Sequence, residues 1–183
     1  MNFSIPLRGL RRFLARLTGV RARPSPFTAD LEVHQVAEAY ALDALDFAER
    51  AFHIALDWSD GSVKRVEAIL DSLYRQKQTM EPPPTDEQVT TFAKMLGSYT
   101  GEVFRRNHGA EWGMVDLGGE RYPGLRATGT EILFWPWGKV QKRLVNGLED
   151  NVWHYYQGLL MDHRKSMRWW RRWRRWLGSA NTG

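Results

Sequence analysis

Residues 85–117, TDEQVTTFAKMLGSYTGEVFRRNHGAEWGMVDL, contain the change of pattern that decides the fold. Thr85 and Gln88 have the spacing of a capping box, and the apolar residues that follow recur at helical intervals. This pattern predicts a helix over 86–107. Residues 111–117 then have the composition and alternation of a strand. The stretch therefore predicts a helix that leads directly into a sheet.

The sequence on either side of this stretch completes an α+β order of elements. Apolar residues with a period near 3.6 predict two earlier helices, and three consecutive prolines separate them from the helix at 86–107. Helices first, then a small antiparallel sheet, then helices again is the order of an α+β domain. The remaining predicted elements are helices over 31–57 and 63–78, a Gly118-Gly119 turn, a strand within 125–134, and helices over 139–145 and from Glu149 to about His163, where the last may continue into the tail.

Charge divides the chain into three parts. Residues 1–30 carry a net charge of +5 and residues 161–183 a net charge of +6, whereas residues 31–160 carry −6. The high isoelectric point of about 9.7 therefore belongs to the ends and does not by itself indicate a nucleic-acid-binding domain. The predicted parts are a basic amphipathic segment and linker at 1–27, a compact acidic α+β domain at 28–163, and a Trp/Arg-rich tail at 164–183.

Both ends have the pattern of basic amphipathic helices. On a helical wheel, the four tail tryptophans and Leu177 fall within about 120° of arc, and five arginines lie opposite them. Indole and guanidinium groups on opposite faces suit a membrane–water interface. The predicted membrane-binding residues are Arg12, Phe13, Arg16, Trp169, Trp170, Arg171, Arg172, Trp173, Arg174, Arg175 and Trp176.

The tail also allows two other interpretations. Its indoles could stack on the bases of a single-stranded nucleic acid, or they could lie in a groove of the body or of a partner protein. The acidic body would repel nucleic-acid phosphates. The regular two-faced pattern therefore favours an anionic membrane first, a groove second and nucleic acid third.

Two stretches resemble a known bacterial family. Residues 96–112, LGSYTGEVFRRNHGAEW, and residues 134–147, FWPWGKVQKRLVNG, followed by Tyr155-Tyr156, are similar to a pattern in the bacterial domain family of unknown function number 3806. The resemblance covers roughly residues 60–158 and neither basic end. It implies a compact bacterial α+β domain, and it implies no activity.

Few residues suggest chemistry. Glu102, His108 and Glu111 lie around the end of the helix at 86–107 and could form an acid–base site in a cleft. A charged helix end with a Glu102–Arg106 pair explains them better, because no nucleophile motif accompanies them. Gly97 and Gly101 lie four residues apart, which predicts close packing of this helix against a neighbouring element.

A basic cluster follows the Trp-Pro-Trp sequence. Lys139, Lys142 and Arg143 could bind an acidic partner protein, or they could pair with the acidic body of the chain itself. The sequence leaves both alternatives open.

No metal or cofactor is expected. The five histidines lack metal-ligand spacing, and phosphate-binding glycine motifs are absent from the sequence. His53, on an apolar stretch, is predicted to be a core histidine. The chain has no cysteine and no apolar run long enough to span a bilayer.

These observations together favour binding over catalysis. The first hypothesis is a non-enzymatic bacterial protein-binding domain, adaptor or immunity-like, that its basic ends hold at the cytoplasmic surface of the inner membrane. Its partners would be an unidentified protein and the anionic membrane. The alternatives are an enzyme with a cleft around Glu102, His108 and Glu111, and an accessory nucleic-acid-binding protein that uses the Trp/Arg tail.

Overall fold

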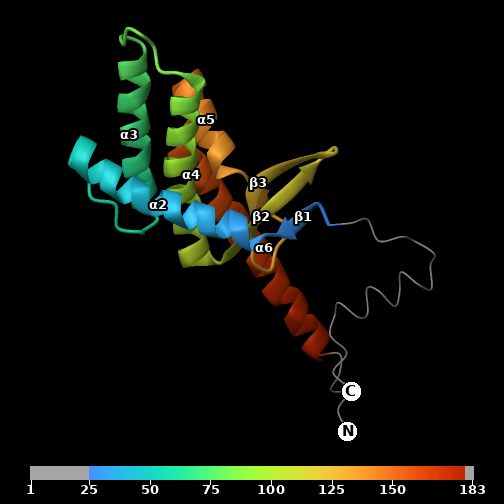
Figure 1. Cartoon of the computed structure of the whole chain (residues 1–183). Coiled ribbons are helices and arrows are strands. Elements are labelled where there is room, and N and C mark those ends of the chain that lie inside the picture. The colour runs from blue at the N-terminus through green and yellow to red at the C-terminus, as the bar shows by residue number, and fades with distance from the viewer. Residues whose placement is uncertain (1–24, 180–183) are drawn as a thin grey trace.

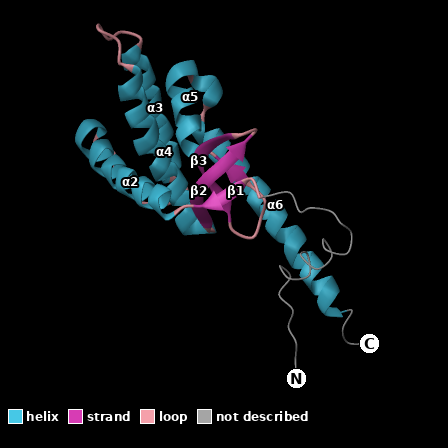
Figure 2. Ribbon diagram, turned by 45° about the vertical axis from the view of Figure 1, so that its right-hand side comes forward, coloured by secondary structure: helices cyan, strands magenta, loops and turns pink. Residues whose placement is uncertain are grey.

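A computed structural model describes residues 25–179, with side chains from 25 to 169. Within this range the chain forms five helices and one four-stranded antiparallel sheet, which confirms the α+β prediction (Figure 1). Helices α2 to α5 gather on one side of the sheet, and α6 runs past it (Figure 2). The elements are β1 (Phe27–Ala29), α2 (Leu31–Phe52), α3 (Ser62–Lys77), α4 (Asp86–His108), β2 (Ala110–Leu117), β3 (Glu120–Ala127), β4 (Leu133–Phe134), α5 (Pro136–Asn146), a 3-10 turn (Leu148–Asp150) and α6 (Val152–Ser179).

Helix α4 is the centre of the body. The predicted capping box begins it: Thr85 Oγ1 accepts from the Gln88 amide, and the Gln88 side chain accepts from the Thr85 amide. Helix α2 crosses α4 and presents a stripe of alanines, which permits a close approach. The stripe consists of the fully buried Ala37, Ala41, Ala44 and Ala48.

The two glycines of α4 make room for its other neighbours, as their spacing predicted. A Cβ at Gly97 would lie 2.9 Å from backbone atoms of Pro136 and Trp137, at the start of α5. A Cβ at Gly101 would lie 2.5 Å from the indole of Trp112 on β2. Any larger residue would therefore push α5 or the sheet away from α4.

The sheet differs from its prediction in two ways. Strand β1 was not predicted; it begins at Phe27, within the expected linker, and pairs with β2 with Phe27 opposite Val115. The single strand predicted within 125–134 is wrong, because β3 and β4 are separate strands joined by a reversal at Gly129, whose φ is +73°. The Gly118-Gly119 turn joins β2 to β3 as predicted.

Several helix boundaries also differ, and α5 begins at Pro136 rather than at Lys139. Helix α2 ends at Phe52 rather than at 57, because His53 adopts a left-handed conformation with φ 53° and caps the helix. His53 is exposed, so its prediction as a core histidine is wrong. The last helix, α6, begins at Val152 rather than at Glu149, and it continues without a break through Ser179, a continuation that the sequence had left open.

The close packing at Gly97 yields a stability prediction. Gly97→Ala should destabilise the protein by about 2 kcal/mol, because the new methyl group meets backbone atoms that cannot rotate away. Gly158→Ala, on α6 with open space around it, is the matched control and should stabilise by about 0.5–1 kcal/mol. Urea unfolding of both variants measures the difference. Equal effects of the two substitutions would show that α4 and α5 are not in close contact.

Candidate functional site

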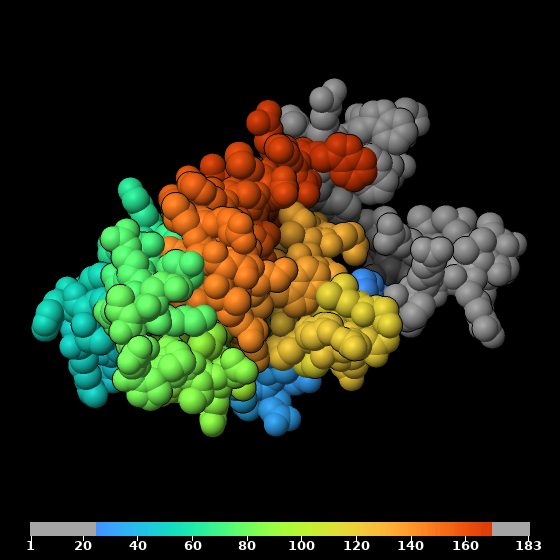
Figure 3. All heavy atoms as spheres, turned by 90° about the horizontal axis from the view of Figure 1, so that it is seen from above, coloured from blue at the N-terminus to red at the C-terminus, as the bar shows by residue number. Residues whose placement is uncertain are grey.

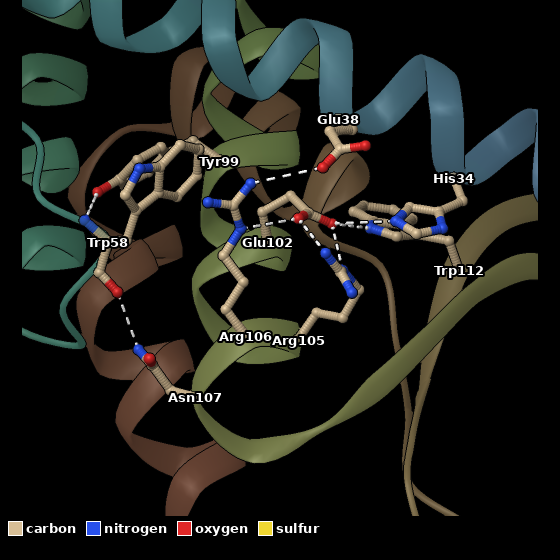
Figure 4. A network of polar contacts seen from close by, with 9 residues as sticks. All are labelled: His34, Glu38, Trp58, Tyr99, Glu102, Arg105, Arg106, Asn107 and Trp112. Carbon is tan, nitrogen blue, oxygen red and sulfur yellow. Dashed lines mark hydrogen bonds and ion pairs between the residues drawn. The ribbon is translucent and has the colours of Figure 1, made fainter.

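The carboxylate of Glu102, on α4, is fully buried and accepts hydrogen bonds from three side chains, and His34 Nε2 on α2 lies 4.0 Å from its Oε1 (Figure 4). Arg105 donates from Nε and Nη2 at 2.8 and 2.9 Å, Arg106 donates from Nε at 3.2 Å, and Trp112 donates from Nε1 at 2.8 Å. Burial alone would raise the pKa of Glu102, but the hydrogen bonds from Arg105 and Trp112 and the arginine charges lower it. Glu102 is therefore an ionised structural anion, and a general base needs a pKa nearer the working pH.

Arg106 extends this network toward the loop after α2. Its guanidinium lies 3.8 Å from the ring centroid of Trp58, and its Nη2 lies 3.6 Å from Glu38 Oε1 on α2. Trp58 stacks on Tyr99 of α4, and its backbone amide donates to the Tyr99 hydroxyl at 2.9 Å. Figure 4 shows these side chains joining α2, α4 and the loop.

His108 has a different partner. Its Nε2 lies 2.9 and 3.0 Å from the two carboxylate oxygens of Asp60, and the Tyr156 hydroxyl donates to the same carboxylate at 2.6 Å. Burial would raise the pKa of Asp60, but the hydrogen bonds from Tyr156 and His108 lower it. This cluster joins α4 and α6 to the loop before α3.

Glu111 lies on the exposed face of β2, where it accepts from Arg126 Nη2 at 2.7 Å. The three residues considered for acid–base chemistry therefore have three separate sets of partners. Glu102 and His108 lie six residues apart on α4 and bind different groups. The geometry is that of structural ion pairs around a helix end.

The basic cluster of α5 is divided by its surroundings. Arg143 is fully buried, with its Nε donating to Glu67 at 2.7 Å and its Nη2 to Asp71 at 2.9 Å. Lys139 donates to Asp150 at 2.7 Å and is about one-fifth exposed. Lys142 is exposed. Pairing with the body thus accounts for Arg143 and Lys139, and Lys142 remains the surface-directed member of the cluster.

An open groove of about 800 Å³ lies between the β2–β3 hairpin and α5. Figure 3 shows these two parts side by side, the hairpin in yellow and α5 in orange. One wall carries Leu117 and Tyr122, which are 50% and 43% exposed at the end of the hairpin. Trp135, Lys139, Lys142 and Tyr155 contribute to the other side. Sequence analysis identified the lysines but not the aromatic walls.

Most of the predicted membrane-binding side chains lie outside the described part of the chain. Arg12, Phe13 and Arg16 fall outside the described residues. Trp170, Arg171, Arg172, Trp173, Arg174, Arg175 and Trp176 lie on the described backbone of α6, but their side chains lie outside the description. Trp169 is 67% exposed.

Among residues 25–179, no group of three or more His, Asp or Glu side chains is placed to hold a metal ion. In the same part of the chain, no helix has the length and apolarity needed to cross a bilayer.

Comparison with known proteins identifies a family and a fold. Residues 70–156 match the family described as Domain of unknown function (DUF3806), which supports the resemblance that the two quoted stretches predicted. A crystal structure from Bacteroides thetaiotaomicron VPI-5482 is similar with a TM-score of 0.54 and 14% identity, over 76% of this chain and 51% of that one. This chain thus spans about half the length of that protein, and the likeness shows the fold alone. No curated protein sequence matches the chain.

The Glu102 network predicts a large effect of one small change. Glu102→Gln removes the anion that two arginines share. Loss of one member of a buried pair costs about 3–5 kcal/mol, and because both arginines are partly exposed, the expected cost is about 3 kcal/mol. Glu111→Gln breaks an exposed pair and should cost less than about 1 kcal/mol. Chemical denaturation at neutral pH measures both values.

The stability difference between the wild type and Glu102→Gln should depend on pH. The pKa of Glu102 is lower in the folded protein than in the unfolded chain. Glu102 therefore contributes its full stability at pH values above its usual pKa of about 4.5, and this contribution is lost as the pH falls further. The gap between wild type and Glu102→Gln should therefore shrink in acid. A gap that is constant down to the acid transition would contradict an ionised Glu102.

A second pH prediction concerns His163 on α6. His163 is 8% exposed, and its ring lies 6.1 Å from that of His108. Burial, and to a smaller extent the charge of His108, lowers the pKa of His163. A hydrogen bond with the backbone of Thr128 acts in the opposite direction and raises this pKa. Neutral His163 therefore contributes its full stability at pH values above its usual pKa of 6.5, and this contribution is lost as the pH falls. His163→Gln should reduce the loss of Tm between about pH 7.5 and about pH 5.5, whereas the exposed His154→Gln should not.

Proposed function

We propose that this chain is a non-enzymatic bacterial binding module that attaches to an anionic membrane surface through the end of α6 and presents its acidic body to a partner protein. An adaptor or an immunity-like role fits this description, at the cytoplasmic face of the inner membrane. The observation that carries the proposal is the unbroken continuation of α6 beyond the body.

The first half of α6 is fixed to the body. Val152, Tyr156, Leu160 and His163 recur at helical spacing and are buried. After His163 the described side chains are exposed or half-buried, and Arg164, Lys165 and Arg168 face solvent. Figures 1 and 2 show the helix extending away from the other elements. A helix fixed at one end therefore carries the Trp/Arg sequence outward.

The dimensions and charge of this extension suit an interface. Residues 164–179 of α6 span about 24 Å. The sequence pattern predicts that the four tail tryptophans share one side of this segment, as an interfacial helix requires. Residues 161–183 carry a net charge of +6, which favours an anionic surface. The binding interpretation of the body is supported by the separate, structural partners of Glu102, His108 and Glu111.

Flotation with anionic vesicles of phosphatidylcholine and phosphatidylglycerol tests the attachment. Binding should weaken as salt rises, because each arginine contributes about 1 kcal/mol that salt screens, but it should not vanish, because indole insertion is not screened. Replacing Arg168, Arg171, Arg172, Arg174 and Arg175 by Gln should remove the salt-sensitive part. Replacing Trp169, Trp170, Trp173 and Trp176 by Ala should remove the salt-resistant part.

Matched controls separate a specific tail from general charge. Arg50→Gln and Arg75→Gln change exposed arginines of the body, 81% and 78% exposed, and should leave vesicle binding unchanged. Neutral vesicles should bind less than anionic ones. If the full chain ignores anionic vesicles and binds single-stranded oligonucleotides through the same residues, the tail is a nucleic-acid site and the proposal is wrong.

A further inference from the structure

We infer that the groove between the β2–β3 hairpin and α5 is the docking site for an acidic peptide segment of a partner protein, one that also carries a large apolar side chain. This inference rests on the proposed protein-binding role but not on membrane attachment. It assigns the binding surface to the groove walls Leu117, Tyr122, Trp135 and Tyr155 and to the lysine Lys142.

The walls supply an apolar contact that the body leaves exposed. Leu117 and Tyr122 are about half exposed at the end of a hairpin that extends beyond the helices (Figure 1). Trp135 lines the same groove. Aromatic side chains in such positions are enriched in protein interfaces.

The charge of the groove selects an acidic occupant. Lys139 and Lys142 lie in the groove with one carboxylate, Asp150, although residues 31–160 as a whole carry −6. Asp150 accepts from Lys139 and from Asn146, each at 2.7 Å, and the charge of Lys142 also acts on it. Lys142 is nevertheless exposed and forms no ion pair among the described residues, so it can face a second carboxylate. The two ends of the chain are themselves basic and are a poor match for this surface.

The strand edge beside the groove favours recognition by side chains. Strand β4 pairs with β3 at Leu125 and Arg126, so the part of β3 before Leu125 lacks a partner on that side within the described sheet. Pro123 stands in that part and lines the groove. A proline cannot donate a backbone hydrogen bond, so an added strand would be poorly held there. The peptide would therefore bind through its apolar and acidic side chains.

A random peptide phage library selected against the full chain in solution, without lipid, tests the inference. Enriched sequences should combine Asp or Glu with Leu, Phe or Trp. Synthetic versions of these peptides should lose about tenfold or more in affinity with Lys142→Glu and with Leu117→Ala.

Two matched variants lie outside the groove. Lys64→Glu makes the same charge change at an exposed lysine of α3, and Leu42→Ala truncates a leucine of α2 that is 52% exposed. Both should alter affinity by less than about twofold. Thermal melting of every variant checks that the fold is retained.

Several outcomes would overturn the inference. These are no enrichment at all, enrichment without acidic residues, or peptides that bind the groove variants and the control variants equally. A dimer that Lys142→Glu dissociates would make a second copy of the chain the occupant instead. Vesicle binding is independent of all these measurements, so a failed membrane attachment and a failed groove give different results.

Discussion

The buried carboxylate of Glu102 is the constraint around which the body is arranged. A fully buried anion is tolerated only where several donors surround it. Two of those donors come from the same helix, and the third, Trp112, comes from β2, so the anion fixes the sheet against α4. Arg106 in turn covers Trp58 and thereby holds the loop after α2. The smallest residue of this region, Gly101, gives the Trp112 indole its space.

A second buried ion pair organises the other side of α4. Arg143 of α5 is held by Glu67 and Asp71 of α3, and the second oxygen of Glu67 accepts from the Val152 amide at the start of α6 at 2.7 Å. Three helices therefore meet at one carboxylate. Because α5 also forms one side of the groove, this pair attaches that side of the groove to α3.

Local patterns made much of the fold predictable. The capping box at Thr85 and the turn at Gly118-Gly119 are decided by neighbours within a few residues, and each is present. The spacing of Gly97 and Gly101 predicted close packing, but their contacts with α5 and β2 come from residues farther along the chain. Strand β1 has three residues and gains its partners from β2, nearly ninety residues away, so no local pattern marks it. The burial of Arg143 depends on Glu67, which is 76 residues away in the sequence. An arginine beside two lysines cannot be distinguished from them without that partner. The groove was hidden for the same reason, since its walls come from a hairpin, a helix and the start of α6.

Helix α6 connects the two proposed binding surfaces. Tyr155, near its start, lines the groove, and Trp169 stands fourteen residues later on the same unbroken helix. At 1.5 Å per residue, the two positions are about 21 Å apart along the axis. If the end of α6 lies in the plane of a membrane surface, its indoles contact lipid at one place and the groove lies about 20 Å to the side. A partner segment could then reach the groove without displacing the tail. The buried contacts between Val152 and His163 determine the position of the tail relative to the groove, because they fix the direction in which the helix leaves the body.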